Sequence, residues 1–137
     1  MLINSLNQRK QTVRNTFNIL LTWDDRFSYL IEMGKILPPF PESKKNEQTF
    51  VPGCQSDAWF LLTSESEKLR IDGDASALIT KGMIGLLSFV YSGSSHEELA
   101  QEDFTLFHDM QLLDQISPNR ANGFSHIIQL VKNYVKH

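Results

Sequence analysis

The sequence predicts an α+β fold in which a small three-stranded antiparallel sheet packs against several helices. Runs of strand length occupy only the middle of the chain, near residues 50–72, whereas apolar residues recur at helical spacing on both sides of it. The chain has 137 residues, of which 41% are hydrophobic and 21% charged. We therefore expect a single domain over residues 1–137, with enough apolar surface to offset its chain entropy.

Two helices are expected before the sheet. Between residues 4 and 21 the apolar residues fall mostly at helical spacing, which predicts a one-sided surface helix. Thr22 followed by Asp25 resembles a capping box and predicts a second helix that stops before Pro38. Prolines and polar residues between 38 and 49 exclude both periodicities, so this segment is expected to be a surface loop.

Three short strands are expected next. Residues 50–51 start the first strand, residues 58–63 form the second, and residues 68–72 form the third after a polar turn at 64–67. Residues 73–74 are expected to end the sheet.

A helix that is apolar on nearly every side follows, up to about Tyr91. Asp74 or Ser76 is expected to cap its start, because both side chains can accept bonds from free backbone N–H groups. Its two glycines, Gly82 and Gly85, each cost about 1 kcal/mol of helix stability relative to alanine. Close packing against the sheet is expected to compensate.

Two start signals predict the remaining helices. Ser95 followed by Glu98 repeats the capping-box pattern and predicts a short helix, after which an apolar stretch continues to about Ile116. Ser117-Pro118 predicts the start of an amphipathic last helix, because proline is favoured at the first helical position.

Composition excludes several classes of partner and location. The net charge of −3 comes from interspersed acids and bases, which gives no electrostatic reason to bind nucleic acid. The first residues lack the pattern of a secretory signal, and no stretch approaches the apolar length of a membrane span. The single cysteine cannot form an internal disulfide and persists best in a reducing compartment, so a cytoplasmic protein is expected.

That cysteine, Cys54, lies at the predicted turn between the first two strands. Gly53 permits unusual backbone angles, and consecutive N–H groups in a tight turn favour a thiolate or persulfide anion. Taken alone, however, the spacing favours an inert cysteine, because free cysteine is usually a small buried hydrophobe.

The residues around this turn resemble a known family. The segment Gly53-Cys54-Gln55-Ser56-Asp57-Ala58-Trp59 is similar to the Gly-Cys-Gln-Ser-x-x-Trp signature of SufE/CsdE-type sulfur acceptors. Further similar segments follow the same order through nearly the whole chain: Tyr29-Leu30-Ile31-Glu32-Met33-Gly34 with Leu37-Pro38, Gly73-Asp74, Lys81-Gly82, and Ser117-Pro118-Asn119-Arg120 with Gly123. The resemblance implies a SufE/IscU-like fold, with Cys54 as the acceptor cysteine.

The resemblance also implies a function in iron–sulfur cluster assembly. The partner would be a pyridoxal-phosphate cysteine desulfurase of the SufS/CsdA type, whose persulfide Cys54 attacks at the outer sulfur. The chain would stimulate that enzyme and deliver sulfur to an iron–sulfur scaffold complex, as an accessory protein rather than a stand-alone enzyme. Neither a cofactor nor a metal is expected on this chain, and a monomer or weak homodimer is expected. With only one cysteine, it fits a relay better than a cluster scaffold.

Four further residues have expected roles. Gln55 and Ser56 are expected to shape the turn through hydrogen bonds, and Trp59 is expected to belong to the core. Arg120 matches a family arginine linked to the desulfurase interface, and its place in the first turn of a helix is unfavourable for a cation. The other interpretation of Arg120 is a solvated side chain paired with an acid.

Two alternative functions remain open. A cysteine-dependent hydrolase would need a base for Cys54, and His96, His108, His126 and His137 are available, although no spacing selects one. An interaction domain with an inert cysteine is the second. A zinc site is less favoured than either, because the ligand pairs typical of structural zinc are missing.

Overall fold

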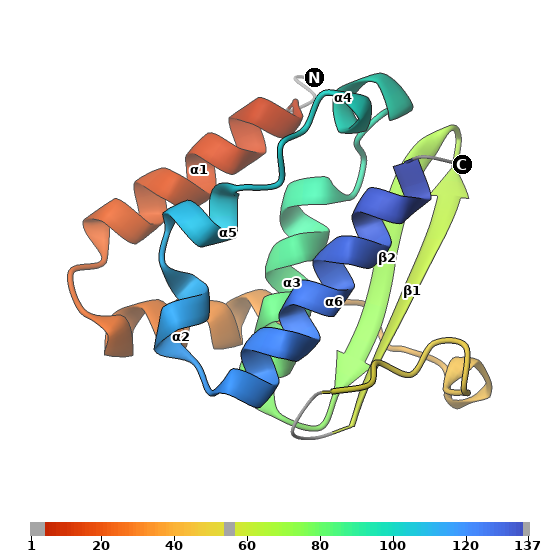
Figure 1. The fold of residues 1–137 in the computed structure, drawn as a ribbon, viewed down its shortest axis with the longest axis horizontal. Coiled ribbons are helices and arrows are strands. Elements are labelled where there is room, and N and C mark those ends of the chain that lie inside the picture. Colours follow the sequence, from red (N-terminus) through yellow and green to blue (C-terminus); the bar gives the residue numbers. More distant parts are fainter. Residues whose placement is uncertain (1–4, 54–56, 136–137) are drawn as a thin grey trace.

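The computed structural model describes residues 5–53 and 57–135, which fold with the expected α+β architecture (Figure 1). The helices are α1 (Leu6–Ile19), α2 (Trp23–Gly34), α3 (Leu78–Tyr91), α4 (His96–Ala100), α5 (Leu106–Asp109) and α6 (Pro118–Val135). The strands are β1 (Ala58–Glu65) and β2 (Lys68–Ala75), and the short 3-10 helices are η1 (Glu42–Lys44) and η2 (Leu112–Gln115).

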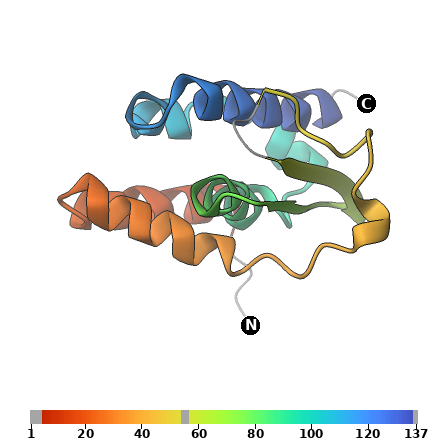
Figure 2. The same ribbon diagram turned by 90° about the horizontal axis from the view of Figure 1, so that it is seen from below.

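The elements form two layers. Helices α1, α2 and α3 lie in one layer, with the β hairpin beside α3, and α6 lies in a second layer over them (Figure 2). Helix α3 is the central element, as its apolar sequence predicts, because α1, α2, α6 and both strands all contact it. Among the described residues, no helix combines the length and the apolar character that crossing a membrane requires.

Strands β1 and β2 form a tight antiparallel hairpin. Its two tip residues, Ser66 and Glu67, have φ angles of 53° and 66°. Positive φ at both positions is the mark of the type I′ turn, whose twist matches that of the flanking strands. Phe60, Leu69 and Ile71 are buried and supply the hairpin's share of the core.

The prediction of a three-stranded sheet is not confirmed. Phe50 pairs with Trp59 in an isolated antiparallel bridge, and the Val51 N–H donates to the Ala58 carbonyl at 2.9 Å. Pro52 follows at once and has no N–H to continue the pairing. The segment at 50–51 is therefore a single bridge beside a sheet of two described strands.

The prediction that Gly73 and Asp74 end the sheet is wrong, because β2 continues to Ala75. A Cβ atom on Gly73 would lie 2.7 Å from the Trp59 carbonyl oxygen and 2.8 Å from the Ile84 Cγ2 atom. Glycine is required here for the close approach of α3 and β1, rather than as a strand breaker.

Helix α3 begins without a side-chain cap, so the predicted caps are also wrong. Its N-cap residue, Ala77, makes no capping bond. Asp74 instead accepts a hydrogen bond from the Ala75 N–H at 2.9 Å, and the Ser76 hydroxyl donates to the Asp57 carbonyl at 3.3 Å. Both candidate side chains are thus engaged where the sheet ends.

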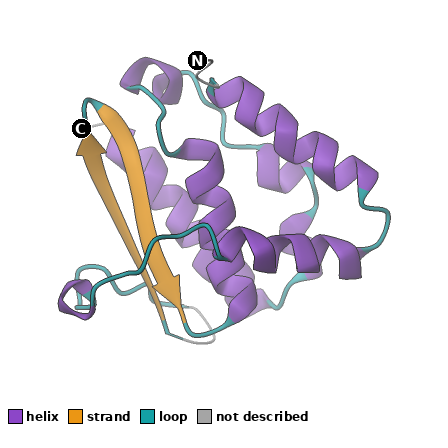
Figure 3. Cartoon of the chain, turned by 180° about the vertical axis from the view of Figure 1, so that it is seen from behind, coloured by secondary structure: helices purple, strands orange, loops and turns teal. Residues whose placement is uncertain are grey.

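Helix α2 lies against α3 (Figure 3). The glycines of α3 pack against α2, not against the sheet as predicted. A Cβ atom on Gly82 would lie 2.2 Å from the Leu30 carbonyl oxygen, and one on Gly85 would lie 2.1 Å from that of Met33. Gly34 closely approaches Gly82 from the α2 side. The cost of glycine within α3 is therefore offset by backbone contact between two helices.

The predicted helix starts outside α3 are confirmed. Thr22 accepts a hydrogen bond from the Asp25 N–H, and Ser95 forms a complete capping box with Glu98. The Glu98 carboxylate also accepts the Leu6 N–H at 2.9 Å, so one side chain caps both α4 and α1. This double cap holds the starts of the two helices together.

Candidate functional site

The cysteine lies on the segment 52–57, which we call the Cys54 loop. Cys54, Gln55 and Ser56 are outside the described residues, so their roles remain predictions. Gly53 has a φ of 85°, in the region that L side chains rarely adopt, and it is exposed. A glycine at this position therefore lets the chain turn directly before the cysteine.

Backbone hydrogen bonds fix both ends of the Cys54 loop. On the first side, the Val51 N–H donates to the Ala58 carbonyl at 2.9 Å. On the second side, the Asp57 carbonyl accepts the Ser76 N–H at 3.0 Å and the Ser76 hydroxyl at 3.3 Å. The loop is thus anchored to the start of β1 and to the junction between β2 and α3.

A group of charged residues lies beside these anchors. The Lys45 Nζ atom is 3.1 Å from Asp74 Oδ2 and 3.0 Å from Glu42 Oε1, and it lies 4.6 Å from the centre of the Trp59 ring. Lys81 approaches the other Asp74 oxygen at 3.4 Å. Trp59 is only partly buried, because Lys45 rather than the core covers one side of it.

The contacts within this group shift the pKa values of Asp74 and Lys45 so that the charged forms are favoured. Burial would raise the pKa of Asp74, but the hydrogen bonds from Lys45 and Ala75 and the charges of Lys81 and Lys45 lower it below its ordinary value. Hydrogen bonds to Glu42 and Asp74 raise the pKa of Lys45. Asp74 and Lys45 are therefore both charged at neutral pH.

Arg120 lies in the first turn of α6, as predicted, and its N–H donates to the Ser117 hydroxyl at 3.3 Å. Its Nε atom is buried and has no hydrogen-bond partner. None of the ion pairs among the described residues involves Arg120. The side chain lines a pocket of about 300 Å³ together with Phe27, Ile79 and Ile116, which speaks against the interpretation of a surface arginine paired with an acid.

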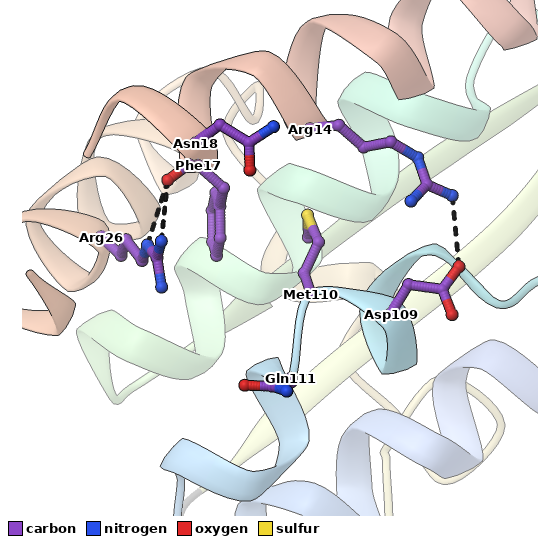
Figure 4. Close-up of a pocket in the computed structure, with 7 residues that line it drawn as sticks. All are labelled: Arg14, Phe17, Asn18, Arg26, Asp109, Met110 and Gln111. Carbon is purple, nitrogen blue, oxygen red and sulfur yellow. Dashed lines mark hydrogen bonds and ion pairs between the residues drawn. The ribbon is translucent and has the colours of Figure 1, made fainter. Parts of the chain in front are cut away.

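A second pocket, of about 250 Å³, lies between α1, α2 and the end of α5 (Figure 4). The Phe17 ring and the Met110 sulfur lie near its middle. At its edges, Arg26 donates to the Phe17 carbonyl at 2.9 Å and Arg14 pairs with Asp109 at 3.3 Å. No residue of the Cys54 loop that the structure describes lines this pocket, and both guanidiniums already join neighbouring elements.

The described histidines lie on the surface. His96, His108 and His126 are exposed, and the His96 ring stacks on Tyr134 at 6.3 Å between ring centres. His137 is outside the described residues. Within the part of the chain that the structure describes, no three His, Cys, Asp or Glu side chains are grouped to hold a metal ion.

Comparison with known proteins identifies the family. The family model described as "SufE: Fe-S metabolism associated domain" matches residues 11–135. The chain belongs to the SufE family. The cysteine desulfuration protein SufE of Wigglesworthia glossinidia brevipalpis is 29% identical over 132 residues, covering 95% of this chain and 91% of that protein.

A further relative supports the SufE assignment, and one solved structure shares the fold. An uncharacterized SufE-like protein of Rhizobium etli is 31% identical over 125 residues, which are 88% of this chain and 84% of that protein. The solution structure of a hypothetical protein from Thermus thermophilus aligns with a TM-score of 0.75 at 22% identity, covering 93% of each chain. The latter shows a shared fold.

The segments that resemble other SufE-family members meet in space. Gly34, the end of the segment 29–34, contacts Gly82. Asp74, of the pair Gly73-Asp74, forms an ion pair with Lys81, the neighbour of Gly82. The segments that resemble other family members thus form the α2–α3 contact and part of the charged group beside the Cys54 loop.

Sequence reasoning missed Lys45, which lies in a segment without periodicity. The alternation of β1 and β2 could have placed Trp59 and Asp74 opposite each other, as the register shows. Nothing local indicates that Lys45 lies over both, because that contact depends on the path of the loop before β1.

Proposed function

We propose that this SufE-family protein accepts sulfur on Cys54 from a cysteine desulfurase and passes it on for iron–sulfur cluster assembly. The observation that carries the proposal is the family match over residues 11–135, which includes the only cysteine of the sequence. The name of the Wigglesworthia relative, a cysteine desulfuration protein, supports the same reaction class. We also infer that the protein acts in the cytoplasm as one domain, alone or as a weak homodimer.

The proposed transfer exchanges one sulfur–sulfur bond for another. The Cys54 thiolate attacks the outer sulfur of the persulfide on the desulfurase, and a new sulfur–sulfur bond forms at Cys54. The old bond breaks and the desulfurase cysteine leaves as a thiolate, so no external oxidant or reductant is needed. The chain needs no cofactor for this step; the pyridoxal phosphate belongs to the partner.

The surroundings of Cys54 have supporting roles in this proposal. Gly53 turns the chain, Gln55 and Ser56 shape the turn, and N–H groups in the turn favour an anionic sulfur. Arg120 contributes to docking of the desulfurase: its guanidinium lacks an acidic partner among the described residues and can pair with one on the desulfurase.

Mass spectrometry tests the transfer. The protein is incubated with its cognate cysteine desulfurase and L-cysteine, without reductant, and the intact mass is measured. The expected result is the addition of one sulfur atom, together with faster desulfurase turnover. Cys54→Ser should abolish both effects, and omission of L-cysteine should prevent the mass change. Stimulation of turnover that survives Cys54→Ser would contradict the acceptor role.

Replacement of Arg120 tests the docking role. Arg120→Ala should weaken desulfurase binding by about 1–2 kcal/mol, roughly tenfold in affinity, while thermal stability changes little. Arg14→Ala serves as a matched control, because Arg14 lines the other pocket. Unchanged desulfurase affinity in Arg120→Ala would remove this residue from the interface.

No observation favours a cysteine hydrolase. A nucleophile–base pair needs a histidine that a third group orients. The three described histidines are exposed, and none of their side chains forms a hydrogen bond or ion pair within the described part of the chain.

A further inference from the structure

Among the described residues, the outer edge of β1 is paired along its first half alone. The Phe60 N–H donates to the Thr49 carbonyl at 2.8 Å. The Ala58 carbonyl accepts the Val51 N–H at 2.9 Å. Before this segment the chain turns away, since the Thr49 N–H donates to the Asn46 carbonyl at 3.2 Å. Figure 3 shows β1 as the outer strand, with the loop that carries η1 beside its first half.

In the second half of β1, the backbone groups of Leu62 and Ser64 point out of this same edge, because bonding direction alternates along an antiparallel strand. No residue in the part of the chain that the structure describes bonds to these groups. The outer edge of β2, by contrast, is covered. The Leu69 N–H donates to the Ser94 carbonyl at 3.0 Å, and the Leu69 carbonyl accepts the Gly93 N–H at 2.7 Å.

We call residues 61–65 the open edge. Exposed strand edges are usually blunted by charged side chains, proline or a bulge, which prevent pairing with another chain. Residues 61–64 read Leu-Leu-Thr-Ser, without charge or proline, and the register with β2 runs without a bulge over all of β1. The charged residue at the end, Glu65, is already paired with Arg70 of the same hairpin at 2.8 Å. The open edge is therefore suited to pairing with a further strand.

We propose that the open edge pairs with the open edge of a second copy of this chain, so that two hairpins form one four-stranded antiparallel sheet about a two-fold axis at Thr63. In this register Leu62 of each copy lies opposite Ser64 of the other. Each such pair exchanges two backbone bonds, which gives about four hydrogen bonds across the interface. The inference goes beyond the proposed function and holds whether or not the chain accepts sulfur.

The register follows from which backbone groups can bond. Pairing Leu62 with Leu62 of the second copy would place that copy's Ser64 where Thr49 already bonds to β1. Pairing Ser64 with Ser64 of the second copy would place Leu62 opposite Ser66, whose φ of 53° turns the chain at the hairpin tip. The register centred on Thr63 lets both Leu62 and Ser64 bond.

The side chains of the two copies are compatible in this register. Thr63 meets Thr63 of the second copy, and threonine pairs across strands are favourable. Glu65 lies opposite Leu61 of the second copy, so no like charges oppose each other across the interface. Within each hairpin, Lys68 flanks Glu65 and Asp72 flanks Leu61. The rows that cross the joined sheet at these positions are therefore mixed in sign.

The small size of this contact sets the expected affinity. A strand edge over residues 61–65 spans about 17 Å. Pairing over that length buries less than the roughly 1,200 Å² of a stable interface. We therefore expect a weak dimer, with a Kd of roughly 0.1–1 mM.

Analytical ultracentrifugation of the full chain, in reductant and over a concentration series, measures this equilibrium. Ser64→Pro removes one outward N–H and spares the bonds between β1 and β2, in which that group takes no part. Thr63→Lys and Thr63→Glu each put like charges at the two-fold axis. Ser28→Lys, at an exposed position of α2, is the matched control for added charge. Circular dichroism confirms that each variant is folded.

We expect the native chain to dimerise and Ser64→Pro to raise the Kd at least about tenfold. Thr63→Lys and Thr63→Glu should each do the same, because like charges directly opposite each other are destabilising. An equimolar mixture of these two variants should recover a heterodimer, because their charges then attract. Ser28→Lys should keep the native Kd.

Cysteine cross-linking tests the register. In a Cys54→Ser background, Thr63→Cys supplies a single thiol whose Cα atom lies about 4.5 Å from its counterpart across the axis, within reach of a disulfide. Leu61→Cys is the matched control on the same face of β1, because its two Cα atoms would lie about 14 Å apart. Oxidation should therefore link Thr63→Cys into dimers much faster than Leu61→Cys.

A native chain that stays monomeric at every concentration overturns the inference. So does a dimer that Ser64→Pro and both charged Thr63 variants leave intact, or one that Ser28→Lys weakens as much as they do. Cross-linking of Leu61→Cys as fast as that of Thr63→Cys refutes the two-fold register.

Discussion

Replacing Gly82 with alanine is expected to destabilise the protein, although alanine is the better helix former. In an exposed helix this change would gain about 1 kcal/mol. At Gly82, however, the new Cβ atom would lie 2.2 Å from the Leu30 carbonyl oxygen and 2.6 Å from its carbon. These are backbone atoms, so no side-chain rotation relieves the overlap, and α2 and α3 have to separate locally by roughly 1 Å.

The expected loss of unfolding free energy in Gly82→Ala follows from the cost of the overlap and the gain in helix propensity. Overpacking of a close interior contact costs typically 1–3 kcal/mol and more where the obstacle is backbone. With the propensity gain subtracted, we expect Gly82→Ala to lose about 2 kcal/mol of unfolding free energy, which lowers the melting temperature by roughly 6–8 °C. Gly85→Ala, whose Cβ would lie 2.1 Å from the Met33 carbonyl oxygen, should behave alike.

Urea unfolding followed by far-ultraviolet circular dichroism measures the effect. Ser28→Ala, at an exposed position of α2, is the control for helix propensity; it should change the unfolding free energy by no more than about 0.5 kcal/mol, in the stabilising direction. If Gly82→Ala proves as stable as the native protein, or more stable, the argument from backbone contact is wrong.

Three other changes have expected outcomes in the same unfolding assay. Replacing Ser66 and Glu67 with Asn-Gly should stabilise the hairpin by about 1 kcal/mol, because both positions have positive φ; no gain would contradict the type I′ assignment. Glu98→Ala should cost about 1–2 kcal/mol, because it uncaps the starts of α1 and α4 together; a loss below about 0.5 kcal/mol would mean that water replaces the carboxylate. Asp74→Asn should lower the unfolding free energy, and the full difference from the native protein should be seen above the ordinary Asp pKa of 3.8. This difference should fade as the pH falls through the lower folded-state pKa of Asp74; a difference that persists unchanged at pH 2 would exclude an ionic origin.

Local signals predicted the helix starts well, because the chemistry of a cap lies within a few residues. Thr22 and the pair Ser95 and Glu98 bond as their spacing predicts, and α6 begins at Pro118. The α+β class followed from periodicity for the same reason. Such features need no knowledge of the tertiary structure.

The errors arise where tertiary contacts decide. Gly73 looks like a strand breaker in the sequence, yet it continues β2 because Ile84 packs where a side chain would be. Val51 looks like the start of a strand, but Pro52 ends the pairing after one bridge. The partner of Gly82 could not be inferred, because nothing local distinguishes a neighbouring helix from a sheet.

The candidate site was predictable only in part. The family signature around Cys54 locates the proposed reacting group, and the position of Arg120 at the start of α6 was expected. The ion pair between Lys45 and Asp74 joins a loop without periodicity to the end of a strand, so it could be found only once the chain was folded.

The tip of the hairpin is far from the end that leads into the Cys54 loop. The strands are eight residues long, so the tip at Ser66 and Glu67 lies about 25 Å from the end that leads into the Cys54 loop. A cysteine-free label attached at that tip, for example through an unnatural amino acid, would report on partner association without touching the reacting thiol. The same tip is the natural place for a fusion or a surface tether.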